Sequence, residues 1–366
     1  MWFAFVLMLI LLIQSLFWFW LWYGISYRRQ NLIHPDSVAD LPSVSIIICA
    51  HNEADNLRRY LPAILEQQPG PLEVIVVNDH STDETLAVLA SLQERYAHLR
   101  IIESTQEPHS GKKGLLEQGI KAATGEVILL TDADCDPASS SWLKWMCSGF
   151  SDKNLLIGGC SPYIFEPGWI NTLTRFENFV TAIQYLGFAT NGLPYMAVGR
   201  NMAYVRKLIE QMGYFSAHTQ YRSGDDDLTV QQALKQTKIA YCIHPDSFVY
   251  TKAPASLHAF FRQKIRHLSV GVAYPRKILI RLSAFILSWL FFYPAFLCLF
   301  FYGFPIVATQ LLILRWIVAA LAYNDYRQTL KQRFNFLQII VLDFVFPWLM
   351  VLFSLFSLSR RNPQWK

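Results

Sequence analysis

Long apolar stretches stand near both ends of the chain. Residues 1–23 carry no charged side chain, residues 282–323 are apolar over about two helix lengths, and residues 336–358 form a further apolar stretch. A helix of about 20 apolar residues crosses the hydrocarbon core of a bilayer. The pattern therefore predicts one N-terminal and about three C-terminal membrane helices.

Between these stretches, short apolar runs alternate with segments of helical periodicity. The runs predict strands over 44–50, 72–77, 99–102 and 126–131. The segments between the runs predict helices over 53–66, 83–96 and 114–123. Apolar runs rich in β-branched residues and separated by helices are typical of a parallel sheet that is covered on both faces.

These patterns divide the chain into five parts. We expect a transmembrane anchor over 1–24, a linker over 25–42, an α/β domain over 43–250, an amphipathic membrane-interface segment over 251–281 and transmembrane helices over 282–366.

The charges around the first apolar stretch indicate its orientation. No Lys or Arg precedes the stretch, bulky aromatic residues fill its end, and Arg28 and Arg29 follow it. A cleaved signal peptide would begin with a basic region and end in small residues. We therefore predict an uncleaved anchor whose following domain is cytoplasmic, in a protein of the bacterial inner membrane.

Composition adds a few constraints. The hydrophobic fraction of 53% is high for a water-soluble protein, and the net charge of +5 is too modest to call for nucleic acid. Six cysteines without a CxxC pair favour reduced thiols over a structural zinc site. Basic residues beside the apolar segments predict contact with membrane lipids, although ordinary helix anchors would look the same: Arg276, Lys277, Arg281, Arg327, Lys331 and Arg333.

Two charges fall inside the C-terminal apolar segments. Arg315 and Asp343 either pair within the helix bundle, or the last segment, which contains Pro347, re-enters the membrane. An outside N-terminus with four spans would also place the basic tail 359–366 outside, against the positive-inside tendency.

Polar residues follow the predicted strands at the edge where ligands bind in parallel sheets. They are Asn52 and Glu53 after the first strand, Asp79 and 80–83 after the second, 110–113 after the third, and Asp132 and Asp134 after the fourth. A helix N-cap would explain residues 81–84 equally well.

Asp132 and Asp134 stand two residues apart at a strand exit, where both carboxylates can face one opening. Hard oxygen ligands suit Mg²⁺ or Mn²⁺, and such ions bridge to substrate phosphates. Lys112, behind a glycine, could hold the same phosphates. An ordinary turn is the alternative for an isolated Asp-Ala-Asp sequence.

The run Ser223-Gly-Asp-Asp-Asp-Leu-Thr229 places three carboxylates side by side. Mutual repulsion raises the pKa of such groups, so that one of them could accept a proton from a hydroxyl. A solvated acidic helix start is the alternative interpretation.

Together these stretches resemble the family 2 glycosyltransferases of the GT-A fold. The matching stretches are VSIIICAHNE (44–53), EVIVVNDHSTD (73–83), GK (111–112), TDADCDP (131–137), VGRNMAY (198–204) and SGDDDLT (223–229). Their order and spacing agree over about 225 residues. The resemblance implies a Rossmann-like, mostly parallel sheet, flanked here by N-terminal and C-terminal transmembrane helices.

The resemblance also implies roles for single residues. Asn52, Glu53 and Asp79 would lie near the nucleotide base and ribose, Asp132 would face the ribose or the metal, and Asp134 would bind the metal. Alignment of 227–229 with the end of the family's TEDxDLT-like motif makes Asp225 the general base and puts Gly224 where glutamate is usual. A shift by one residue would make Asp226 the base.

Membrane-bound members carry a Gln-x-x-Arg-Trp motif that contacts the diphosphate and acceptor. Gln263 and Arg266 match it, but His267 replaces the tryptophan, which puts a processive role in doubt. As an amphipathic interfacial helix, the same stretch would place Phe260 and Phe261 in the lipid headgroups. Its basic residues Arg262, Lys264 and Arg266 would then face lipid phosphates.

We therefore expect inverting transfer from a nucleotide-diphosphate sugar, with a UDP-sugar favoured, to a lipid-linked or glycan acceptor of the cell envelope. The alternatives are a processive polysaccharide synthase and a non-catalytic nucleotide-binding membrane protein. We expect residues 162–194 to choose the acceptor or to pack on the bilayer.

Overall fold

The computed structural model describes residues 1–33, 41–105, 107, 111–221 and 223–359. Part of the predicted linker, Ser110 and the basic tail from 360 onward lie outside the described residues. The described chain forms two compact units. We call Asn31–Asn171 with Tyr195–Ala255 the sheet unit, and Met1–Gln30 with Thr172–Pro194 and Ser256–Arg361 the helical unit.

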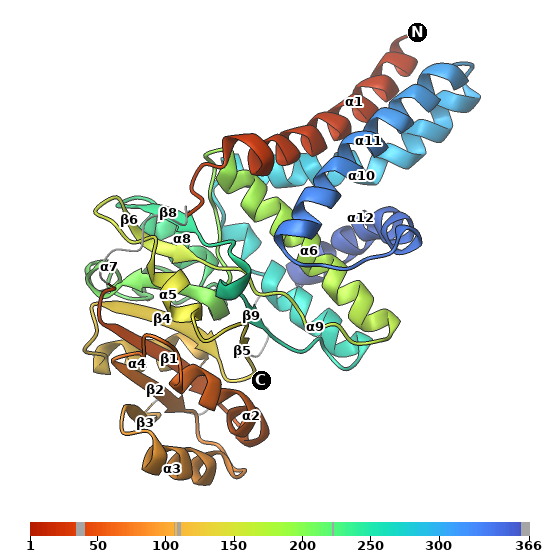
Figure 1. Ribbon diagram of the computed structural model, residues 1–366. Coiled ribbons are helices and arrows are strands. Elements are labelled where there is room, and N and C mark those ends of the chain that lie inside the picture. The colour runs from red at the N-terminus through yellow and green to blue at the C-terminus, as the bar shows by residue number, and fades with distance from the viewer. Residues whose placement is uncertain (34–40, 106, 108–110, 222, 360–366) are drawn as a thin grey trace. The chain divides into compact units, whose positions relative to one another are not determined.

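A seven-stranded sheet forms the core of the sheet unit (Figure 1). Its strand order is β3-β2-β1-β4-β7-β6-β8. The first four strands along the chain pair in parallel, and β7 is antiparallel to both of its neighbours. The strands are β1 (Val44–Ala50), β2 (Glu73–Asn78), β3 (Leu99–Glu103), β4 (Val127–Asp132), β6 (Asn154–Gly158), β7 (Met202–Val205) and β8 (Lys238–Tyr241).

Helices connect these strands. They are α2 (Ala54–Leu65), α3 (Thr85–Arg95), α4 (Lys112–Ala122), α5 (Trp142–Cys147), α7 (Arg206–Gln211) and α8 (Asp227–Ala233), with short 3₁₀ turns at Gly199–Asn201, Ser216–His218 and Pro245–Ser247. The first three of them, α2, α3 and α4, are the helices that the sequence pattern predicts. Every residue of β1 and β2 is buried, which is why both strands read as continuous apolar runs. The α/β class and the mostly parallel sheet are confirmed.

A small second sheet lies beside the exit of β4. β5 (Asp136–Pro137) pairs antiparallel with β9 (Val249–Tyr250). This pairing brings Thr251, more than a hundred residues further along the chain, next to Asp134: the Thr251 hydroxyl donates to Asp134 Oδ2 at 3.1 Å.

The helical unit contains four helices that are long and apolar enough to cross a membrane. They are α1 (Trp2–Tyr23, continued by a π-helical turn at Gly24–Arg28), α10 (Arg276–Phe301), α11 (Pro305–Thr329) and α12 (Phe336–Ser359). α1, α10 and α11 pack against one another (Figure 1). The unit also contains α6 (Trp169–Thr190), α9 (Leu257–Leu268) and a 3₁₀ turn at Gly271–Ala273.

The two charges in the apolar segments form an ion pair inside this unit. Arg315 Nη2 lies 2.7 Å from Asp343 Oδ1, and neither side chain is exposed. The hydroxyls of Tyr293 and Tyr323 also donate to the Asp343 carboxylate, at 2.6 and 2.8 Å. Of the two alternatives, the structure shows the pairing of Arg315 with Asp343, and α12 runs continuously through Pro347.

The prediction for the face of α9 is wrong for two side chains. Phe260 is fully buried, and it packs against Leu173 and Phe353. Lys264 forms an ion pair with Glu177 of α6, and both side chains are 8% exposed. Both side chains therefore contact other helices of the protein and not lipid. The helical periodicity of α9 could not reveal this, because the partners lie on α6 and α12.

Residues 162–194 are largely helical. α6 spans 22 of them, and Thr172–Pro194 groups with the helical unit although the chain enters and leaves it from the sheet unit.

Candidate active site

Two loops at the carboxyl end of the sheet hold each other through Asn52. The Asn52 backbone has φ of 55°, a left-handed conformation that asparagine tolerates better than most residues. Its amide N–H donates to Ser81 Oγ at 2.9 Å, and its Oδ1 accepts from the backbone N–H of Thr82 at 2.8 Å and of Asp83 at 3.3 Å. Asn52 therefore fixes the loop after β2 against the loop after β1.

Asp79 and Glu53 lie at the same edge and are buried. Asp79 Oδ1 has no hydrogen-bond donor among the described residues, whereas Glu53 Oε2 accepts from Asn56 Nδ2 at 2.6 Å. A buried carboxylate oxygen without a donor is costly. Asp79 therefore offers an acceptor that a ribose hydroxyl or a base N–H could satisfy.

Lys112, which follows the loop after β3, contacts two carboxylates from other parts of the chain. α4 begins at Lys112, two residues earlier than predicted, because Gly111 adopts φ of 109° immediately before it. Lys112 Nζ lies 2.5 Å from Asp132 Oδ1 and 3.7 Å from Asp225 Oδ2. The ammonium thus brings together two carboxylates that are 93 residues apart in the sequence.

Burial opposes the charged form of Lys112, but Asp132 and Asp225 raise its pKa above the ordinary value. Lys112 therefore stays cationic. A positive charge fixed at this point can neutralise a phosphate as well as the carboxylates beside it.

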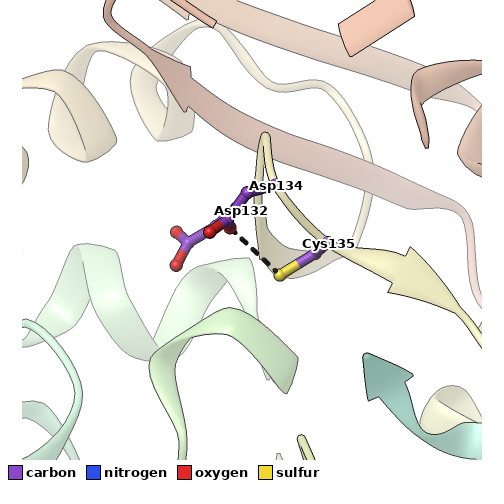
Figure 2. A group of neighbouring side chains, drawn as sticks. All are labelled: Asp132, Asp134 and Cys135. Carbon is purple, nitrogen blue, oxygen red and sulfur yellow. Dashed lines mark hydrogen bonds between the residues drawn. The ribbon is translucent and has the colours of Figure 1, made fainter. Parts of the chain in front are cut away.

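Asp132, the last residue of β4, and Asp134 form a cluster with Cys135 (Figure 2). Ligand atoms of Asp132, Asp134 and Cys135 lie within 4.8 Å of one another, and Cys135 Sγ donates to Asp134 Oδ1 at 3.6 Å. Burial raises the pKa of the Cys135 thiol well above its usual range. A neutral thiol is a poor ligand for a hard cation, so the two carboxylates are the donors that fit Mg²⁺ or Mn²⁺.

The electrostatics of Asp134 agree with a cation site. Burial raises the pKa of this carboxyl, repulsion by Asp132 raises it further, and Arg200 lowers it. A divalent cation between Asp132 and Asp134 would relieve that repulsion.

Arg200 is a site residue that the sequence reasoning did not single out. Its Nε donates to Ser161 Oγ at 2.5 Å, its Nη2 donates to the Ser161 carbonyl at 3.1 Å, and the guanidinium lies 5.4 Å from the centre of the Tyr163 ring. These contacts fix a charge that acts on both Asp132 and Asp134. Arg200 belongs to the 198–204 stretch, which resembles a family motif. The sequence alone does not show which carboxylates an arginine in a loop will lie near.

Asp226 forms hydrogen bonds that hold the start of α8 and the loop at Gly199. It caps α8, since its Oδ1 accepts from Asp227 N–H at 2.8 Å, and its Oδ2 accepts from Gly199 N–H at 3.2 Å. A Cβ at position 199 would stand only 3.0 Å from Asp226 Cβ, so glycine permits this approach. Burial, and then Asp225, raise the pKa of Asp226 to about 6. Asp226 therefore lies at a helix start as the alternative interpretation has it, but its side chain is partly buried and not fully solvated. Asp225 lies beside Lys112.

Gln263 and Arg266 belong to α9 of the helical unit. Arg266 is partly buried, and its Nη2 lies 3.5 Å from His267 Nε2. Their predicted contact with the diphosphate stays a prediction.

Residues 45–213 match the profile of glycosyl transferase family 2. These residues form a family 2 glycosyltransferase domain. The match contains both aspartates of the Asp-Ala-Asp sequence and the Gly-Lys pair, and it confirms the family resemblance over these residues. The 223–229 run, Gln263 and Arg266 lie outside the match, and the roles assigned to single residues stay predictions.

Relatives and a solved structure agree with this assignment. A probable glycosyltransferase, YdaM, of Bacillus subtilis is 26% identical over 63% of this chain and 56% of its own length. A beta-monoglucosyldiacylglycerol synthase of Nostoc is 32% identical over 33% of this chain and 26% of its own length. The chain thus spans about half or less of these relatives.

In three dimensions, the chain is similar to the mannosyltransferase PcManGT from Pyrobaculum calidifontis, solved in complex with GDP-Man and Mn²⁺. The TM-score is 0.60 at 16% identity, over 98% of this chain and 97% of the other. At that identity the likeness shows the fold, which is the GT-A fold that the glycosyltransferase motifs predict.

Proposed function

We propose that this chain transfers a sugar from a nucleotide-diphosphate sugar to a hydroxyl group of an acceptor, with inversion at the anomeric carbon. One observation carries the proposal: the Lys112 ammonium contacts both Asp132, the first aspartate of the Asp-Ala-Asp sequence, and Asp225. This contact supports a diphosphate site and a base that both lie within reach of one bound sugar. Inverting transfer needs the base and the leaving diphosphate on opposite faces of the same anomeric carbon.

Asp225 is the proposed base. The acceptor oxygen forms a bond to the anomeric carbon as its proton passes to the Asp225 carboxylate. The bond from the anomeric carbon to the diphosphate oxygen breaks, and its electron pair leaves with the nucleoside diphosphate. Asp226 is the less suited candidate, because both of its oxygens already accept backbone N–H groups.

Lys112 and Arg200 hold and neutralise the departing diphosphate in this proposal, and Asp132 and Asp134 hold Mg²⁺ or Mn²⁺. The cation supplies charge neutralisation for the leaving group when it is bound. Support for it comes from the raised pKa of Asp134 and from the Mn²⁺ with which the structurally similar PcManGT was solved. Asn52, Glu53 and Asp79 would border the nucleoside, where Asp79 Oδ1 needs a donor.

The donor we favour is a UDP-sugar, and the acceptor is lipid-linked. Four helices suited to a membrane favour an acceptor that diffuses in the bilayer, and the name of the Nostoc relative describes a glycolipid product. The catalytic domain would face the cytoplasm of a bacterial inner membrane. A processive polysaccharide synthase would instead lengthen one glycan repeatedly.

The test is sugar transfer by the purified full chain in lipid nanodiscs. UDP- and GDP-sugars are supplied with glycolipid and polyisoprenyl phosphate acceptors, with Mn²⁺, with Mg²⁺ or with EDTA. We expect metal-dependent addition of one sugar, and an Asp225→Asn variant that is about 10³-fold slower, as is common for loss of a catalytic base. Asp152→Asn, at an exposed position, is the matched control.

Long products in the same assay would favour the processive alternative. Full activity of Asp225→Asn would refute its role as base. Absence of transfer with every donor, with nucleotide binding intact, would favour a non-catalytic nucleotide-binding protein.

A further inference from the structure

Two adjacent lysines at the start of α4 make contacts of different kinds. Lys112 faces carboxylates, whereas Lys113 forms no ion pair within the described chain. The Lys113 ammonium instead donates to two backbone carbonyls, that of His218 at 2.9 Å and that of Tyr221 at 2.8 Å. Hydrogen bonds from a charged donor are stronger than those between neutral groups.

Those carbonyls belong to the segment that leads to Asp225. Residues 212–226, which we call the base segment, connect α7 to α8 and contain only one short 3₁₀ turn, Ser216–His218, among the residues that the structure describes. Within the described chain, Lys113 is the only residue outside 209–226 whose side chain donates a hydrogen bond to residues 216–221. The ammonium is therefore the side-chain attachment of residues 216–221, the middle of the base segment, to the rest of the sheet unit. The two ends of the segment have attachments of their own: Gln232 Nε2 donates to the Met212 carbonyl at 3.0 Å, and Gly199 N–H donates to Asp226 Oδ2 at 3.2 Å.

The side chain of His218 does not supply a second polar attachment. Its ring is buried, and neither ring nitrogen has a hydrogen-bond partner in the described structure. Burial, and then the charge of Lys113, lower the pKa of the ring to about 4, so that it is neutral near pH 7. The ring does contact Phe215, with ring centres 6.0 Å apart. Among the described residues, apolar packing and Lys113 are thus the two interactions that can hold residues 216–221 against the rest of the sheet unit.

We propose that Lys113 is a positioning residue that ties the base segment to the first turn of α4. Lys112 and Lys113 then act from a single helical turn: one meets Asp132 and Asp225, and the other fixes the backbone from which Asp225 projects. The distance between the diphosphate site and the base is set by this turn. The consequence for catalysis rests on the proposed function, but the tether itself does not.

The test measures backbone exchange and transfer in the same preparations. Purified full-chain Lys113→Met, Lys113→Arg and wild-type protein are compared by amide hydrogen exchange and by transfer kinetics. Lys144→Met is the control, since Lys144 is exposed on α5. In Lys113→Met we expect exchange over 216–221 to rise at least about tenfold, because hydrogen bonds to a charged group are lost.

Transfer should separate positioning from substrate binding. We expect Lys113→Met to lower kcat about 30-fold with KM for the nucleotide sugar changed less than about threefold, the pattern of an interaction that matters only in the transition state. Lys113→Arg, which keeps the charge and the donors, should recover most of both effects.

Unchanged exchange over 216–221 in Lys113→Met would overturn the proposal, since packing by Phe215 would then suffice. A rise in KM that matches the whole loss of kcat/KM would also overturn it, because Lys113 would then be a substrate contact. If Lys113→Met does not accumulate, Lys113→Gln is judged by the same criteria. If wild-type protein transfers no sugar, the exchange result still decides the tether, and the proposed function alone fails.

Discussion

Buried acidic groups at the two ends of the parallel sheet differ in how well the protein stabilises their charge. At the amino end, Glu73 Oε1 accepts from Ser45 Oγ at 2.7 Å and from the N–H and hydroxyl of Thr124 at 2.7 and 2.8 Å, and its other oxygen pairs with Arg100. Burial raises the pKa of Glu73, but these hydrogen bonds outweigh it and lower the pKa to about 2. This carboxylate joins β1, β2, β3 and the entry to β4.

At the carboxyl end, partly buried acidic groups repel one another, and one carboxylate oxygen lacks a donor among the described residues. Burial and neighbouring carboxylates raise the pKa of both Asp134 and Asp226, and Asp79 Oδ1 has no donor in the described chain. The hydrogen bonds and pKa shifts therefore distinguish an acidic group that stabilises the fold from acidic groups that a ligand could stabilise. Glu73 is satisfied by the protein itself, whereas the carboxyl-end cluster is completed by cation and substrate in our proposal.

The largest effect should come from Asp134. Asp134→Asn should lower transfer about 10³-fold or more, because a metal ligand is weakened while the packing is kept. The thermal midpoint without metal should stay equal or rise, since a repelled charge is removed. Transfer kinetics and thermal unfolding, each with and without Mn²⁺, provide the measurements. A lower midpoint without metal would show that Asp134, like Glu73, stabilises the fold.

Glu73→Gln should show the reverse pattern. Loss of a buried, hydrogen-bonded charge that has an ionic partner should lower the free energy of unfolding by about 2–4 kcal/mol. We expect kcat per folded molecule to stay within about twofold of wild type, because Glu73 lies at the end of the sheet remote from the site. Denaturation curves and active-site titration would test this prediction. A large loss of kcat at unchanged stability would contradict the division between the two ends.

The smallest effect is a difference in pH dependence. The pKa of Glu73 is depressed from 4.5 to about 2, so its contribution is complete above pH 4.5 and is lost as the pH falls toward 2. The pKa of Asp226 is raised from 3.8 to about 6, so its contribution is complete below pH 3.8 and is lost as the pH rises through 6. In Glu73→Gln, the thermal midpoint should therefore fall less than in wild type as the pH drops from 4.5 toward 2. In Asp226→Asn, the decrease of the thermal midpoint that wild type shows between about pH 4 and 6 should be absent.

Much of this architecture could be predicted from neighbouring residues. Continuous apolar runs indicated the first four strands, and long uncharged stretches indicated the helices suited to a membrane, because burial on both faces or contact with lipid leaves its mark on every successive position. The motifs also identified Asp132, Asp134 and Asp225 as candidates. Glycine at position 111 marked the start of α4 only to within two residues, since the pattern does not show where the backbone turns.

Partners far apart in the sequence could not be predicted in this way. Lys112 meets Asp225, Lys113 meets the carbonyls of residues 218 and 221, and Lys264 pairs with Glu177 of another helix. Each pairing joins segments that the fold brings together, and a side chain gives no local sign of which distant group will satisfy it.

The sequence by itself determined the kind of each element, the family of the glycosyltransferase domain and the set of acidic residues from which a site could be built. Only the tertiary structure decided that Asp226 caps a helix while Asp225 faces Lys112, and that Arg200 acts on the Asp132–Asp134 pair. The physical reason is range: periodicity and helix-forming tendency act between near neighbours, whereas electrostatics and hydrogen bonding in a site depend on distances that exist only after the chain has folded.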